Sequence, residues 1–576
     1  MGKGIKKKKL LLDDDGQNSQ SDNGLSAEEW LSCAQALVPK ALQKAKEVKN
    51  FPGRWKMIIS KLDQIPSRLS DLSSHPFFSK NALCKEQLQS VSKTLNETIE
   101  LADLCLNEKF EGKLRMQSDL DSLTCRLDLN LRDCNLLIKT GVLSSSGPTG
   151  PPEPDSTAHG PNNIRELLAR LHIGHLESKH RALDALVEAM KDDEKDVLAN
   201  IGRAHVSALV QLLSAMSSPR MREKAAAVAC QLAESGGSLV EGLLVSEGAL
   251  PPLIRLIESG GPVGRERAVV ALQRLSGRGP DAARSIVGHG GARPLIELCR
   301  FGDSVSQSAA ACALKNVSAA VPEARRALVE SGLVRVMIDL LDRGILLGSR
   351  EHAAECLQSL TSGNDELRRA VISEGGVRSL LSYLDGPLPQ ESAVGALKNL
   401  IGLLPNEVLV SGGVIPRLAH VLQSGSPTAR QAAAWAIVRI CSSSSSVEMK
   451  KLVGQSGCIP NLVRLLEEKS NGAREVGAHA ISCLMSVSCN CREVKKEEKS
   501  VPSLVALLDP SQQNTAKKYA VTCLGMLCSS KKCRKLMVSY GAIGYLKKLS
   551  EMDVAGAKKL LERLERGRLK GFFGRK

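Results

Sequence analysis

Aromatic residues are scarce in this sequence. Its 576 residues include only 3 Trp, 4 Tyr and 7 Phe, although 43% of all residues are hydrophobic. A core built from Leu, Val, Ile and Ala argues against β-sandwiches and β-barrels, which favour aromatic and β-branched residues. The chain is also too long for one ordinary core, so we expect several domains or a repeat array.

Long hydrophobic runs are missing as well. No apolar run reaches the roughly 18 to 20 residues that a membrane helix needs. The start, MGKGIKKKKLLLDDD, has too short a leucine run for a signal peptide. The 17 cysteines are an odd number without a secretion signal. They indicate a reducing compartment, so we expect a cytoplasmic or nuclear protein, or both.

Motifs for catalysis are lacking too. The sequence contains no GxxxxGK[ST], HExxH or GxSxG pattern. The Gly-Gly pairs at 290–291, 375–376 and 412–413 lie at predicted helix ends rather than after strands, so we interpret them as helix caps. We therefore expect no enzyme activity, no catalytic residue, no cofactor and no small-molecule substrate.

A metal site is considered near the C-terminus, where cysteines cluster close to His479. Their spacing is not that of paired CxxC motifs, and Cys483 and Cys523 replace small apolar residues in Ala-rich helices. Buried free thiols are the favoured interpretation, and no metal is expected. The cluster consists of Cys483, Cys489, Cys491, Cys523, Cys528 and Cys533.

Local composition changes along the chain and predicts its organisation. A helical pattern between residues 25 and 140 is broken at 51–53, at 73–76 and near Gly112, which predicts about four helices. The next segment holds four Gly and five Pro and cannot pack a core. We predict a disordered N-terminus (1–24), a helical bundle (25–140), a Pro/Gly linker (141–163), a repeat region (164–566) and a basic tail (567–576).

An internal repeat dominates the region from 164 to 566. The phrase LIRLI at Leu253 recurs in related forms, in steps of 42, 44, 42, 42, 43, 38, 44, 42 and 42 residues. A Gly-containing run precedes each phrase, and an Ala-rich segment follows it. These patterns predict units of three helices and no strands. The phrases start at Leu167, Leu209, Leu253, Leu295, Met337, Leu380, Leu418, Leu462, Leu504 and Leu546.

These units resemble the armadillo-repeat family. The period fits, and so do the Gly-x-x-Pro-x-Leu-Val and Ala-Ala-x-Ala-Leu-x-Asn-Leu phrases. The resemblance implies an all-α fold, a right-handed armadillo α-solenoid of about nine to ten repeats after an N-terminal helical bundle. Residues 25–140 are similar to the helical region that precedes the repeats in plant armadillo proteins. These include the armadillo vacuolar adaptor and U-box/armadillo proteins, although no U-box is present here.

The resemblance also implies a peptide-binding groove lined by the third helices. Family members grip the peptide backbone with an Asn late in the third helix, which only Asn316 and Asn399 keep. Nuclear-import receptors place a Trp one turn earlier, as Trp435 does here, but its partner is Arg439. The acidic residues with which import receptors take basic cargo are missing. An import receptor is therefore disfavoured, although the fold agrees.

The predicted groove residues differ between its two ends. The N-terminal end is basic, with Arg181, Lys224, Arg267 and Arg274, whereas Trp435 and Tyr519 make the C-terminal end apolar. We predict a protein partner, an extended segment that is acidic at one end and apolar at the other. The alternative interpretation is a solvated charged face with Trp435 in the core. Nucleic acid is disfavoured because aromatic and basic residues do not alternate.

A second basic pattern lies nine residues before each Asn-ladder position. Nine residues make two and a half helical turns, so these side chains face away from the groove. We predict that each ties its helix to a neighbouring carbonyl or carboxylate. The pattern comprises Lys179, Arg222, Arg265, Gln307, Arg350, Gln390, Arg430, Arg474 and Lys517.

The predicted function is a non-catalytic protein-interaction scaffold. The first alternative is a partner-recruiting component of a ubiquitin-ligase assembly without its own U-box. The second is a membrane-associated adaptor, since the net charge is +16 and both termini are basic. Such termini would suit an anionic membrane surface. Acylation of Gly2 is disfavoured because position 6 is Lys instead of Ser or Thr.

Overall fold

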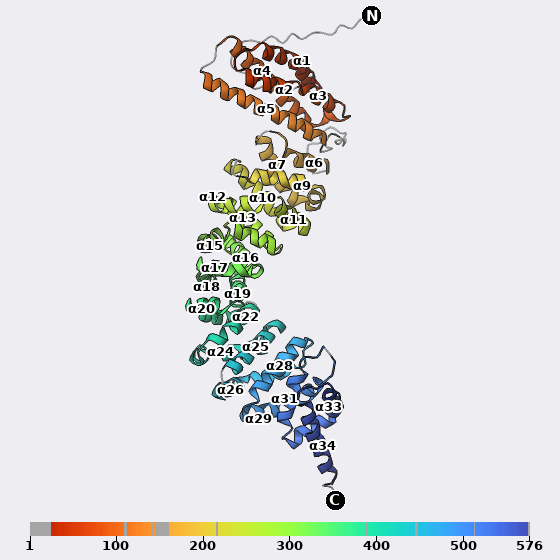
Figure 1. The fold of residues 1–576 in the computed structure, drawn as a ribbon, viewed down its shortest axis with the longest axis vertical. Coiled ribbons are helices and arrows are strands. Elements are labelled where there is room, and N and C mark those ends of the chain that lie inside the picture. The colour runs from red at the N-terminus through yellow and green to blue at the C-terminus, as the bar shows by residue number, and fades with distance from the viewer. Residues whose placement is uncertain are drawn as a thin grey trace. The chain divides into compact units, whose positions relative to one another are not determined.

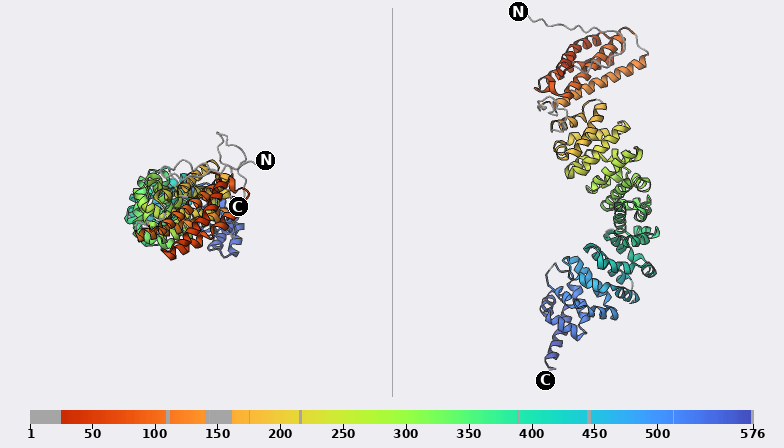
Figure 2. Two further views of the ribbon diagram at one scale, coloured as in Figure 1. Left: turned by 90° about the horizontal axis from the view of Figure 1, so that it is seen from above. Right: turned by 180° about the vertical axis from the view of Figure 1, so that it is seen from behind.

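Every regular element that can be described in the chain is a helix (Figures 1 and 2). The computed structural model describes residues 25–108, 112–139, 143, 161–174, 176–214, 217–387, 390–443, 447–511 and 513–573. The chain divides into two compact units, residues 1–236 (unit 1) and 237–576 (unit 2). None of the helices in the described part is long and apolar enough to cross a membrane.

Unit 1 begins with five α-helices where the sequence predicted about four. The additional break separates α2 from α3, because Pro66 is the second residue of α3 and has no N–H to continue the preceding helix. Their buried core includes Trp55, Leu88 and Leu120. The helices are α1 (Ala27–Glu47), α2 (Pro52–Leu62), α3 (Ile65–Ser73), α4 (Ala82–Leu106) and α5 (Lys113–Lys139).

Five further helices complete unit 1, and the first of them joins the same core. Ala169 and Ile173, at the end of α6, belong to the hydrophobic cluster of the N-terminal helices. The two parts of unit 1 therefore share buried surface. These helices are α6 (Pro161–Arg170), α7 (Leu176–Asp192), α8 (Glu194–Asn200), α9 (Arg203–Leu213) and α10 (Pro219–Ser235).

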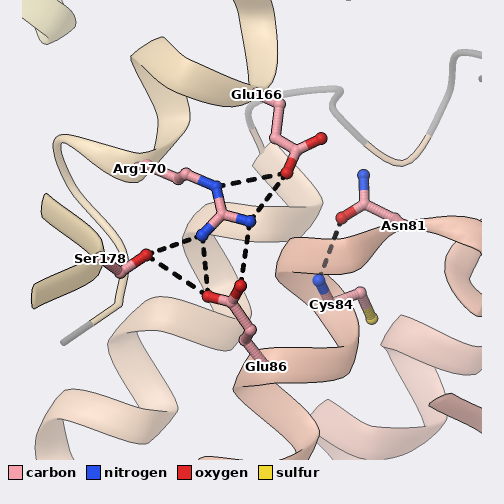
Figure 3. Close-up of polar contacts among 6 residues, drawn as sticks. All are labelled: Asn81, Cys84, Glu86, Glu166, Arg170 and Ser178. Atoms are coloured by element: carbon pink, nitrogen blue, oxygen red, sulfur yellow. Dashed lines mark hydrogen bonds and ion pairs between the residues drawn. The ribbon is translucent and has the colours of Figure 1, made fainter. Parts of the chain in front are cut away.

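Arg170 makes the main polar link inside unit 1. Figure 3 shows its guanidinium between Glu86 of α4 and Glu166 of α6, with Ser178 of α7 beside it. Its two terminal nitrogens lie 2.8 and 3.0 Å from the Glu86 carboxylate, a bidentate pair. It also bonds Glu166 at 2.9 Å and the Ser178 hydroxyl at 2.7 Å. Only 15% of the Arg170 side chain is exposed. We call these four residues the Arg170 cluster.

Helices α11 to α34 of unit 2 fall into consecutive groups of three. The first helices are α11 (Gly237–Ser246), α14 (Pro280–Gly288), α17 (Arg325–Glu330), α20 (Asp365–Ser373), α23 (Asn406–Ser411), α26 (Val447–Val453), α29 (Ser488–Lys496) and α32 (Lys531–Ser539). The second helices are α12 (Leu250–Ser259), α15 (Ala292–Phe301), α18 (Leu333–Arg343), α21 (Gly376–Leu384), α24 (Val414–Ser424), α27 (Ile459–Leu465), α30 (Ser500–Ala506) and α33 (Ala542–Glu551). The third helices are α13 (Pro262–Ser276), α16 (Ser304–Ala320), α19 (Leu347–Thr361), α22 (Glu391–Leu400), α25 (Pro427–Ser443), α28 (Asn471–Leu484), α31 (Lys517–Leu527) and α34 (Ala557–Phe573).

The Gly-Gly pairs end the first helices, as the sequence predicted. Gly375, between α20 and α21, has φ of 83°, a left-handed conformation that favours glycine. A Cβ on Gly376 would lie 2.8 Å from the Val371 carbonyl oxygen. The pair therefore serves a tight turn between two helices, and its interpretation as a cap is confirmed.

Alanine brings the third helices together. In α16, Ala310, Ala311 and Ala313 are fully buried. This helix contacts the third helices on both sides, α13 and α19, as well as the second helix of its own group, α15. Small side chains let the backbones approach closely, so the third helices of unit 2 form one continuous layer. The predicted all-α stack of three-helix units is confirmed, whereas the number of repeats and the handedness stay predictions.

Two of the predicted segment boundaries can be compared with the ends of described helices. Residues 1–24 and most of the predicted linker lie outside the described residues, and α6 begins at Pro161. At the other end, α34 runs to Phe573, so the predicted basic tail starts within a helix. The side chains of the tail lie outside the described residues.

The shortest repeat step, 38 residues, leaves a short first helix. Helix α23 has six residues, and Pro405 before it has no N–H to extend it. Helix α17 also has six, but a 3₁₀ turn at Pro322–Ala324 runs directly into it. In a repeat array the stability of each unit is local. We therefore expect amide hydrogen exchange in unit 2 to be fastest at residues 402–413. Mass-spectrometric exchange would show this, with α17 as the control, and uniform protection across 350–440 would contradict it.

Candidate functional site

The third helices leave one face uncovered. Each packs one side on its second helix, as α13 does on α12 and α25 on α24. The predicted groove residues of unit 2 are half-buried or exposed on the remaining side. We call this face the third-helix surface. Arg181 and Lys224 lie on α7 and α10 of unit 1, and the other predicted groove residues lie in unit 2.

The two Asn residues that match the family pattern connect neighbouring third helices. The Asn316 amide nitrogen donates to the Ser276 hydroxyl at 2.9 Å and to the Gln273 carbonyl at 3.4 Å. The Asn399 amide nitrogen donates to the Thr361 hydroxyl at 3.3 Å. Within the described residues, no hydrogen bond engages the side-chain oxygen of either Asn. Each therefore keeps an acceptor for a partner's backbone N–H.

Carboxylates accompany the predicted basic residues of unit 1. Arg181 lies 3.7 Å from Glu177, and Lys224 pairs with Asp184. A hollow of about 380 Å³ beside Lys224 is also lined by Asp184 and Glu188. An acidic segment would meet two carboxylates there, so the charge of this end is more balanced than the sequence pattern indicated.

Arg267 and Arg274 carry the positive charge of this surface at the start of unit 2. Both side chains are exposed on α13, seven residues apart and so on nearly the same side of the helix. Among the described residues, neither makes an ion pair or a hydrogen bond. Two unpaired guanidinium groups on one helix suit an acidic segment.

Three aromatic rings from successive third helices lie in a row. Trp435 of α25 meets His479 of α28 edge-on, with ring centroids 5.9 Å apart. His479 in turn stacks on Tyr519 of α31, at 4.2 Å between centroids and 14° between planes. Each ring is only half-buried. We call Trp435, His479 and Tyr519 the aromatic row.

The aromatic row is a neutral platform with cations at its edge. Burial, with Lys518 nearby, lowers the pKa of His479, so its ring is uncharged at neutral pH. The Lys518 ammonium lies 4.7 Å from the Tyr519 ring centroid. Arg439, one turn after Trp435, donates to the Lys398 carbonyl at 3.3 Å. Such a surface suits apolar or aromatic side chains. Sequence reasoning had assigned His479 only to the cysteine cluster, although it lies four residues before the ladder position, as Trp435 does.

The second basic pattern is largely structural, as predicted. Arg265 and Arg350 donate to the Gly260 and Leu341 carbonyls, both at 2.8 Å. Likewise Lys517 donates to the Ser511 carbonyl at 3.3 Å, and Arg430 pairs with Glu468 at 2.7 Å. Each of these contacts ties the start of a third helix to a neighbouring segment. Arg222 and Arg430 each have a buried Nε without a partner within the described residues, although Arg430 pairs with Glu468 through a terminal nitrogen.

The C-terminal cysteines are free thiols. Cys523, Cys528 and Cys533 are buried, and the other three members of the cluster are half-buried. Burial raises the pKa of Cys523, so it stays a thiol at neutral pH. In the part of the chain that the structure describes, no three potential metal ligands lie together.

A polar cluster on α16 and α19 was not predicted. His352 lies 3.3 Å from the Glu355 carboxylate, which also pairs with Lys315 at 3.2 Å. Hydrogen bonding to Cys312 and to Glu355 raises the pKa of His352 to about 9. Burial opposes ionisation of the Cys312 thiol, but its contact with His352 outweighs this and lowers its pKa.

The raised pKa of His352 predicts a pH effect. The pKa of His352 is higher in the folded chain than in the unfolded chain, so protonation of this residue adds to the free energy of unfolding. The contribution is complete below about pH 6.5 and is lost as the pH rises through about 9. Nuclear magnetic resonance titration of the imidazole should show the raised value. Glu355→Gln should bring it down, whereas the neighbouring Glu351→Gln should leave it in place. A His352 that titrates at its ordinary value would contradict the cluster.

The sequence matches two family models. Residues 407–442, which run from α23 to α25, match the armadillo/β-catenin-like repeat. Residues 32–142, the N-terminal helices, match a domain of unknown function, DUF7032. No curated protein matches the sequence. The repeat match thus covers one three-helix group, the one that follows the 38-residue repeat step.

Several solved structures are similar to the chain. An engineered protein is 25% identical, covers 70% of this chain and 98% of its own, and has a TM-score of 0.58. A designed armadillo repeat protein is 22% identical over 41% of this chain and 99% of its own, with a TM-score of 0.38. Another, solved in complex with the peptide (KR)4, is 23% identical over 41% of this chain and 99% of its own, with a TM-score of 0.37.

The fold and the comparisons agree on the type of repeat. Three-helix groups recur through unit 2, one of them matches the armadillo repeat model, and an engineered protein shares the fold over most of its own length. Residues 407–442 are thus similar to an armadillo repeat, and unit 2 is an all-α stack of three-helix groups of the same architecture.

Proposed function

We propose that this chain is a non-catalytic scaffold that binds an extended segment of a partner protein along the third-helix surface. The aromatic row carries the proposal. Three half-exposed rings from successive third helices lie together in a chain with only 3 Trp and 4 Tyr. Aromatic side chains that remain accessible on a rigid surface are typical anchors for protein partners.

The surface also indicates the chemistry of the partner. Arg267 and Arg274 favour acidic side chains, and the aromatic row favours apolar ones further along. The free side-chain oxygens of Asn316 and Asn399 suit the backbone N–H groups of an extended segment. We propose an acidic-to-apolar protein segment and a cytoplasmic or nuclear location, which imaging of a fluorescent fusion would test.

The experiment begins with the partners themselves. Proximity labelling by the intact protein and by one lacking residues 164–566 identifies candidates, whose binding is then measured with purified proteins. Trp435→Ala and Tyr519→Ala should raise the dissociation rate about tenfold, because an apolar anchor acts after the encounter. Tyr540→Ala changes an exposed tyrosine directly after α32, a first helix, and should leave the rate unchanged. Equal rates for the wild type and the two anchor variants would refute the proposal.

Two further roles stay predictions: a component of a ubiquitin-ligase assembly and a membrane-associated adaptor. Nothing in the described residues favours either role. A pull-down with residues 25–140 tests whether the N-terminal helices recruit a ligase. Mass spectrometry of the N-terminus tests whether Gly2 is acylated.

A further inference from the structure

A pocket opens on the side of unit 2 away from the third-helix surface. Its volume is about 540 Å³, and its lining includes Ile372, Val377, Leu381, Leu404 and Val408. These residues come from α20, α21 and α23 and from the turn before α23. No residue of a third helix lines it, so it is distinct from the proposed partner-binding surface.

The pocket follows from the shortest repeat step. Helix α20 has nine residues, whereas α23, in the equivalent place of the next group, has six. Pro405 holds an extended conformation before α23, with ψ of 150°, where a longer helix would continue. The short helix therefore covers less of the second helix α21 and leaves its apolar side chains open.

Three charged residues line this pocket, and one of them is unpaired. Arg417 and Asp385 form a bidentate pair at 2.9 and 2.7 Å. Their hydrogen bond lowers the pKa of Asp385, so both partners are ionised at neutral pH and their charges cancel. The Arg378 side chain is exposed, and no ion pair or hydrogen bond engages its guanidinium within the described residues. The lining therefore has one uncompensated positive charge.

We propose that this pocket binds a small amphipathic carboxylate. The apolar body lies against Leu381 and Val408, and the carboxylate pairs with the Arg378 guanidinium. Sites for small ligands typically measure about 300 to 1,000 Å³ and combine an apolar lining with a few polar groups that orient the ligand. An apolar pocket with a single free guanidinium selects an anion with an apolar body over a neutral or cationic analogue. This site does not depend on the proposed scaffold function.

Decanoate is a suitable probe, with decanol as its neutral match. Isothermal titration calorimetry of the full chain should show saturable decanoate binding at one site and weaker binding of decanol. Arg378→Gln should weaken decanoate binding about fivefold, as expected for the loss of a solvent-exposed ion pair. Arg369→Gln removes an exposed arginine of α20 outside the lining and should have no effect.

A second pair of variants tests the location. Val408 and Val410 are both on α23 and 37% and 49% exposed, but only Val408 lines the pocket. Val408→Trp should fill the pocket and abolish binding, whereas Val410→Trp should not. Decanoate should also slow hydrogen exchange at residues 404–412. The proposal is overturned if decanoate does not saturate, if decanol binds equally well, or if Arg378→Gln and Val408→Trp bind decanoate like the wild type.

Discussion

Replacing Arg170 with alanine should destabilise the junction between the N-terminal helices and the repeats by about 2 kcal/mol. The change leaves the Glu86 and Glu166 carboxylates without their shared cation. Losing one partner of a buried ion pair costs about 3 to 5 kcal/mol, and partial exposure of both carboxylates reduces this. Hydrogen exchange of α4 and α6 in the full chain would measure the loss of protection.

The neighbouring Arg165 provides a matched control. It lies on the same helix but donates only to the Asn200 side chain, in an exposed position. Arg165→Ala should therefore change protection by little. Arg170→Lys keeps the charge but not the bidentate geometry, so its effect should be intermediate. If Arg170→Ala left the exchange of α4 and α6 unchanged, the cluster would not hold the two parts of unit 1 together.

The second large effect concerns partner binding and rests on the proposed scaffold function. Reversing Arg267 and Arg274 to Glu should weaken binding of an acidic partner roughly 30-fold at low salt, at about 1 kcal/mol per reversed charge. It should also flatten the salt dependence, because these charges speed the encounter. Binding kinetics at several salt concentrations would measure both changes.

The control for this experiment keeps the same change in net charge. Arg255 and Arg335 are exposed on the second helices α12 and α18, away from the third-helix surface. Their reversal to Glu should leave binding nearly unchanged. Reversing Arg350 should instead lower stability, because it removes a donor to the Leu341 carbonyl. Wild-type affinity of the folded Arg267/Arg274 variant at low salt would contradict the predicted charge complementarity.

Contacts that follow the repeat period could be anticipated from the sequence, and others could not. Asn316 meets Ser276, 40 residues earlier, and Tyr519 stacks on His479 at the same separation. A period of about 42 residues places such pairs on adjacent third helices. The His479 stack was nevertheless missed, because this residue had been considered together with the cysteines near it in the sequence.

The Arg170 cluster had no comparable signal. Arg170 and Glu86 are 84 residues apart, and Glu86 lies in a helix outside the repeat pattern. Their pairing depends on how α4 docks on α6, which no periodicity describes. The pocket beside Arg378 could be predicted from the sequence only in part. The 38-residue step predicted a short helix, but only packing shows which apolar side chains it leaves open.

The short helix α23 also affects how unit 2 would respond to a pulling force. Contacts in the unit run mainly between adjacent groups, so a load along the stack would pass through every junction, and the weakest junction would part first. We expect the junction beside α23 to part first, because this short helix leaves a pocket open on the apolar side chains of α21. Unit 2 would then lengthen in steps, and the groups on either side of this junction would stay folded.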